Sequence, residues 1–94
     1  MRRMAAYPAY SIPAGVKVDY LLGKTRADVA EHGGVVWVGN RGRQARQARR
    51  LQAAARADGY PTEYRTGAAG QQILIVHSPG REPPRADGWW GRSN

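Results

Sequence analysis

Two arginines and two glycines occur in the run Gly39-Asn40-Arg41-Gly42-Arg43, where a predicted strand is followed by a predicted helix. A helix N-terminus carries positive partial charge, so arginines there destabilise the helix, and Gly42 lowers its propensity further. No acidic residue follows before Asp58, near the other end of that helix. An anion held by free backbone amides and two guanidiniums would remove the conflict, so the run predicts a phosphate-binding site. The alternative is that Asn40 caps the helix and the arginines are merely solvated.

A row of arginines extends this pattern along the helix. Residues 41–58 contain no proline and are rich in alanine, arginine and glutamine, which favours a helix. At 100° per residue Ala48, Leu51 and Ala55 fall on one side and most arginines on the other. With Lys24 and Arg26 added from the preceding segment, the predicted binding residues are Lys24, Arg26, Asn40, Arg41, Gly42, Arg43, Arg46, Arg49 and Arg50. A solvated charged face is the alternative interpretation.

Other residue types give little support for catalysis or metal binding. The chain has no cysteine, which excludes disulfides, thiolate ligands and cysteine nucleophiles. Its two histidines, His32 and His77, match no metal-ligand spacing, and Ser78 points to the opposite side of a strand from His77. Gly23-Lys24-Thr25 lacks the earlier glycine of a phosphate-binding loop, because Val18 stands there. We expect a protein that is not an enzyme, with no metal and no cofactor.

The hydrophobic pattern predicts an α+β fold with the order β-α-β-α-β-β. Residues 16–22 alternate apolar and polar side chains, as in a half-buried strand. Thr25 and Asp28 have the spacing of a capping box that would start a short helix, and Gly33-Gly34 would end it. Further strands are predicted at 35–38, 62–66 and 72–77. This order predicts a mixed four-stranded sheet with both helices on one face.

The second face of such a sheet would be apolar and without a helix to cover it. The side chains predicted on this partner or dimer face are Leu21, Val35, Trp37, Leu74 and Val76. We expect a cover for so much apolar surface. It could come from Trp89 and Trp90 in the C-terminal tail, from a second copy in a homodimer, or from a partner protein.

Length and charge limit the classes of protein to consider. A chain of 94 residues builds one core, here expected over residues 15–78, with an extended arm at 1–14 and a flexible tail at 79–94. No apolar run approaches a membrane span or a secretory signal, so we expect a cytoplasmic protein that does not bind membranes. The formal net charge of +8 predicts an anionic partner, although the abundance of arginine is also typical of a high-GC bacterium or phage.

Residues 16–77 resemble the Alba-like nucleic-acid-binding fold in the order of their predicted elements. Gly23-Lys24 is similar to the glycine-lysine turn of that family, and Arg41-Gly42-Arg43 is similar to its arginine-glycine-arginine helix start. The resemblance implies that both turns lie together on a nucleic-acid-binding side and that the protein dimerises. Residues 35–60 also resemble a repeat of the SPOR fold, which binds cell-wall glycan.

These observations predict a small nucleic-acid-binding protein that contacts phosphates of DNA or RNA through the start of the arginine-rich helix. The alternative is a small adaptor or inhibitor that binds a host or partner protein. It would use the apolar sheet face and the tail aromatics.

Overall fold

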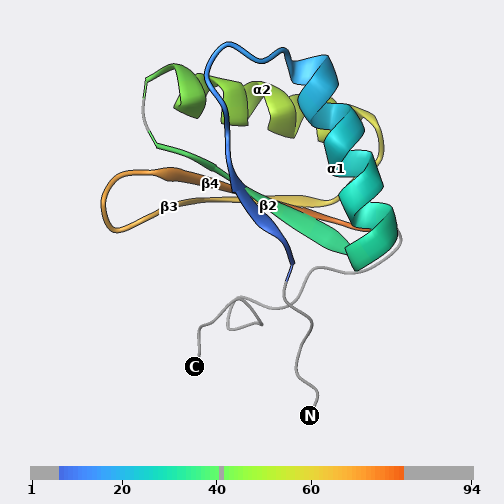
Figure 1. The fold of residues 1–94 in the computed structure, drawn as a ribbon. Helices are drawn as coiled ribbons and strands as arrows, with labels where there is room; N and C mark the ends of the chain where they lie inside the picture. Colours follow the sequence, from blue (N-terminus) through green and yellow to red (C-terminus); the bar gives the residue numbers. More distant parts are fainter. Residues whose placement is uncertain (1–6, 41, 80–94) are drawn as a thin grey trace.

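Six elements form the fold in this computed structural model, which describes residues 7–40 and 42–79. In chain order they are β1 (Ala9–Ser11), α1 (Val18–His32), β2 (Gly34–Gly39), α2 (Arg43–Ala57), β3 (Thr62–Thr66) and β4 (Gln72–His77). The strands make one sheet in the order β1-β2-β4-β3, with β1 parallel to β2 and β4 antiparallel to both of its neighbours. Both helices lie on the same face of the sheet (Figure 1). The predicted α+β class, element order and mixed sheet are confirmed.

The first third of the fold differs from the prediction. Residues 16–22, predicted as a strand, form the loop before α1 and its first turns, while Ala9–Ser11 from the predicted arm forms the edge strand β1. The apolar residues of this segment fit a helix as well as a strand, since Val18, Leu21 and Leu22 are spaced i, i+3, i+4. Leu21 is fully buried against the sheet. This packing favours the helical spacing over the alternation of a strand.

Thr25 was predicted to start a helix and lies instead in the middle of α1. Its buried hydroxyl donates to the Leu21 carbonyl at 2.8 Å and accepts a hydrogen bond from the Trp37 indole at 2.9 Å. These bonds satisfy two polar groups inside the core. The N-cap residue of α1 is Lys17. The predicted end of the helix is confirmed at Gly33, whose φ of 85° is in the left-handed region.

The hydrophobic core fills the space between the helices and the sheet. The helices contribute Leu21, Val29, Ala48, Leu51 and Ala55, and the sheet contributes Val35, Trp37, Leu74 and Val76. The stripe predicted on the arginine-rich helix is therefore the side of α2 that packs. No helix among the described residues is long and apolar enough to cross a membrane.

The side chains predicted to form a partner or dimer face are part of this core. Leu21, Val35, Trp37, Leu74 and Val76 are all 2% exposed or less, because Leu21 packs from α1 onto the sheet and the four strand residues point toward the helices. Successive side chains of a strand point to opposite faces, so the neighbouring Val36, Val38, Ile73 and Ile75 occupy the face away from the helices. Trp89 and Trp90 lie outside the described residues.

The helical position of Gly23 gives a test of α1. An added Cβ at Gly23 would meet no atom within 4 Å, and the residue is exposed. We therefore expect Gly23→Ala to raise the free energy of unfolding by about 1 kcal/mol, because alanine loses less backbone entropy in a helix. Urea denaturation measures the change. If Gly23→Ala lowered the free energy of unfolding, Gly23 would lie in a turn and not inside α1.

Candidate anion-binding groove

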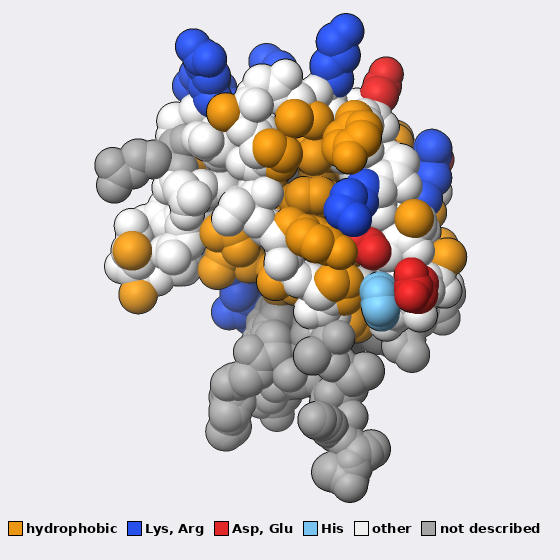
Figure 2. Space-filling view, in the orientation of Figure 1, with side chains coloured by type: hydrophobic (Ala, Val, Ile, Leu, Met, Phe, Trp, Pro, Cys, Tyr) orange, Lys and Arg blue, Asp and Glu red, His pale blue; other side chains and the backbone are white. Residues whose placement is uncertain are grey.

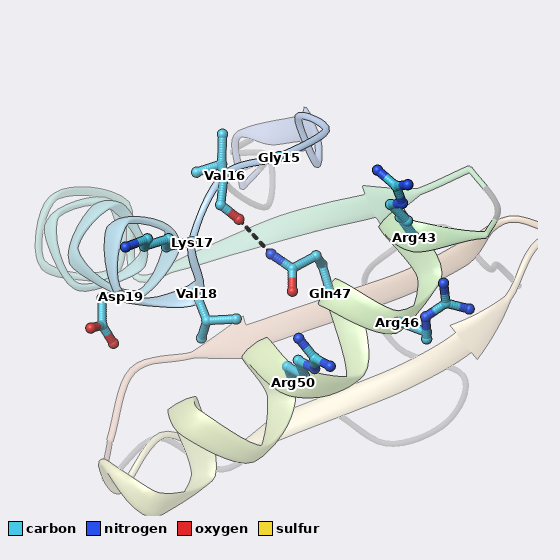
Figure 3. A pocket seen from close by; sticks show the side chains of 9 residues that line it. All are labelled: Gly15, Val16, Lys17, Val18, Asp19, Arg43, Arg46, Gln47 and Arg50. Carbon is cyan, nitrogen blue, oxygen red and sulfur yellow. Dashed lines mark hydrogen bonds between the residues drawn. The ribbon is translucent and has the colours of Figure 1, made fainter.

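A groove of about 760 Å³ lies between the start of α1 and the first half of α2 (Figure 3). One wall is made by residues 15–19, which lead into α1. The other wall is made by Arg43, Arg46, Gln47 and Arg50 of α2. We call this feature the cationic groove, and it is defined by these nine residues.

The arginines of the groove share one side of α2. Arg43, Arg46 and Arg50 are spaced by three and four residues, so they project from the helix in the same direction, and all three are exposed. Between them, the Gln47 side-chain amide donates a hydrogen bond to the Val16 carbonyl. This bond ties the loop to α2. Lysine and arginine side chains lie over α2 and the start of α1 at the top of Figure 2, while others lie elsewhere on this face.

Both helices begin at this groove, and no side chain caps either of them. The N-cap residue of α2, which directly precedes Arg43, is Gly42, with a φ of 59°. The first turn of α2 contains no acidic residue. The N-cap residue of α1 is Lys17, whose side chain makes no capping hydrogen bond. Free amides and the positive ends of two helix dipoles therefore add to the three arginine side chains of α2. Asp19 is the one carboxylate among the lining residues.

Two of the predicted binding residues lie on α1 and are paired with acids. The Lys24 ammonium is 3.6 Å from Asp28 Oδ2 and 4.5 Å from the centre of the Tyr10 ring. Arg26 donates from Nε to Asp58 Oδ2 at 2.8 Å. The hydrogen bond and charge of Asp58 raise the pKa of Arg26. Desolvation lowers the pKa of Lys24, but Asp28 and Tyr10 together outweigh it, so that pKa is also raised. Neither cation lines the cationic groove.

The remaining predicted residues divide between the groove and its surroundings. Arg43, Arg46 and Arg50 line it, whereas the Arg49 guanidinium stacks over Tyr64, 4.1 Å from the ring centre. Asn40 and Gly42 precede the helix, and Arg41 lies outside the described residues. The sequence prediction missed the wall formed by residues 15–19 and the tie made by Gln47. A helix start at Val18, had it been predicted, would have been the signal for that wall.

A second group of polar side chains lies on the last turns of α1. Asp28, Glu31 and His32 each offer a ligand atom within 4.8 Å of the others, although no metal-ligand spacing was predicted. The group forms because positions i, i+3 and i+4 share a helix face. The ammonium of Lys24, already paired with Asp28, opposes a further cation there.

Comparison with known proteins identifies the fold but no family. No protein-family model matches the chain, and no curated protein matches it. Among solved structures, a SirA-like protein from Desulfitobacterium hafniense has a similar fold, with a TM-score of 0.55. The match covers 77% of this chain and 97% of that chain, at 17% sequence identity. At that identity the likeness shows the fold alone.

This comparison corrects the functional prediction from the sequence. The solved structure that shares the fold is a SirA-like protein and not an Alba-like one. The Alba-like resemblance also required Gly23-Lys24 in a turn after a strand, and both residues are inside α1. The nucleic-acid-binding interpretation is therefore wrong. The adaptor interpretation is not supported either, because the residues assigned to its apolar sheet face are in the core.

Proposed function

We propose that the chain is a binding protein, not an enzyme, and that it holds a small organic anion in the cationic groove. The observation that supports this most directly is the row Arg43, Arg46 and Arg50 facing a second wall across an open groove. A volume of about 760 Å³ lies within the range of about 300–1,000 Å³ typical of small-molecule sites.

The chemistry of the row favours a carboxylate or a phosphate. A guanidinium presents paired N–H donors that match the two oxygens of either group. Arg43 and Arg46 are about 4.5 Å apart along the helix axis, from a rise of 1.5 Å per residue, so one phosphate can contact both. The uncapped start of α2 adds free amides beside them.

The lining residues also argue for binding without catalysis. Among the described residues that line the groove there is no histidine, serine, threonine or tyrosine, and the side chains of its one acid, Asp19, and its one lysine, Lys17, point away from α2. General acid–base or nucleophilic catalysis needs such groups in mutual hydrogen-bond reach. A homodimer, a protein partner and a cytoplasmic location stay predictions.

Titration calorimetry with inorganic phosphate and with citrate tests the proposal at low ionic strength. We expect Arg46→Gln to weaken binding of both anions about tenfold, near the lower limit for the loss of one charge-assisted contact. Arg56→Gln is the matched control, because Arg56 is an exposed arginine in the last turn of the same helix, outside the groove. Added salt is expected to weaken binding through screening.

Two results would contradict or redirect the proposal. Equal affinity of Arg46→Gln and Arg56→Gln would show that the anion does not bind in the groove. A short peptide of aspartate and glutamate, titrated in parallel, identifies the source of the negative charge. If that peptide binds through Arg46 and neither small anion does, the groove takes acidic side chains of a partner protein.

A further inference from the structure

The two walls of the cationic groove differ in chemical character. The α2 wall carries guanidiniums, whereas the opposite wall includes Val16 and Val18, which are half-buried and packed against the hydrophobic core. Figure 3 shows Val18 beside Arg50, with Arg43 at the other end of the groove. The groove thus has a strongly cationic end and an end where hydrocarbon is exposed.

Charge also falls off toward the Val18 end. The two charged residues that flank Val18 in the chain, Lys17 and Asp19, both have side chains that point away from α2 (Figure 3). Among the lining residues, Arg50 is therefore the cation nearest Val18, whereas Arg43 lies at the other end of the groove. Arg50 offers a three-carbon stem as well as its charge, and such stems cover apolar surface. This end therefore favours an uncharged, apolar group.

Resting on the proposed function, we propose that the ligand is an amphipathic anion. Its phosphate or carboxylate binds at Arg43 and Arg46, and its hydrocarbon part lies on Val16, Val18 and the stem of Arg50. Short-chain alkyl phosphates or carboxylates are the matching chemical class. A purely polar polyanion would leave the two valines exposed.

A chain-length series tests this inference on the wild-type protein. Inorganic phosphate, ethyl phosphate and butyl phosphate are titrated by calorimetry, with 1-butanol as the uncharged control. Full burial of one methylene strengthens binding by about fourfold, so we expect butyl phosphate to bind about tenfold more tightly than ethyl phosphate. The alcohol is expected not to bind, because it lacks the group that the arginines hold.

Variants then locate the hydrocarbon part. Val18→Thr keeps the side-chain shape but replaces a methyl group with a hydroxyl, so it should reduce the advantage of butyl phosphate over ethyl phosphate to threefold or less. If Val18→Thr does not fold, Val16→Thr is used for the same comparison. Val38→Thr, on the sheet face away from the helices, is the control and should keep the full advantage.

The outcomes separate this inference from the proposed function. If inorganic phosphate binds through Arg46 and affinity does not rise with chain length, the amphipathic ligand is ruled out and the anion-binding function stands. An advantage of butyl phosphate that survives in both valine variants would also overturn the inference. If no anion binds at low ionic strength, both proposals fail together.

Discussion

Replacement of Gly39 by alanine is expected to lower the free energy of unfolding by up to about 3 kcal/mol, the upper range for overpacking a core. Gly39 is the buried last residue of β2. An added Cβ would lie 2.6 Å from the Gln44 carbonyl oxygen, 2.8 Å from its carbonyl carbon and 3.1 Å from the Ala45 nitrogen. These are backbone atoms of the first turns of α2, so no side-chain rotation relieves the clash. The helix start must move instead.

The same variant should also weaken anion binding, because Arg43 is the first residue of α2 and moves with it. Urea denaturation measures the stability, and calorimetry with inorganic phosphate measures the affinity. Gly23→Ala is the matched control, expected to change stability in the opposite direction and to leave affinity unchanged. A Gly39→Ala protein as stable as wild type would show that α2 does not approach β2 this closely.

The elements from β2 onward were predictable from the sequence, whereas β1 and the first half of α1 were not. The strands at 62–66 and 72–77 have the predicted bounds, and β2 and α2 lie within one or two residues of theirs. β1 has three residues, and its place depends on parallel pairing with β2, which no local pattern records. The alternation in residues 16–22 is typical of a strand, but burial of Leu21 against the sheet favours the helix. Tertiary contacts decided this segment.

The cationic groove was half predictable for the same reason. Helical spacing alone places Arg43, Arg46 and Arg50 together, and the structure agrees. The opposite wall is brought near by the bond from Gln47 to Val16, which joins residues 31 positions apart. Charge counting likewise could not show that Arg26 pairs with Asp58, 32 positions away. The sequence shows which cations exist, whereas the fold decides which remain available.

His77→Ala is expected to lower the free energy of unfolding by about 2–4 kcal/mol, from the lost ring volume and a carboxylate left without its partner. His77 is fully buried, on the face of the sheet away from the helices by strand alternation. With the imidazole proton on Nε2, that nitrogen donates to Glu63 Oε2 at 3.0 Å, and the Tyr7 hydroxyl donates to Nδ1 at 2.9 Å. The histidine thereby joins β4, β3 and the segment that precedes β1.

Tyr7→Phe separates the hydrogen bond from the packing of His77. It removes only the hydroxyl, so we expect a loss of about 1 kcal/mol, and a double-mutant cycle with His77→Ala should show a coupling of similar size. If His77→Ala costs no more than Tyr7→Phe, the buried ring does not hold these segments together.

Because His77 lies across the sheet from the cationic groove, His77→Ala should change the affinity for phosphate less than twofold once the protein is folded. Gly39→Ala should weaken that binding several-fold at a similar loss of stability. Two variants with similar stability and different affinity would show that the position of α2, and not global stability, controls the groove.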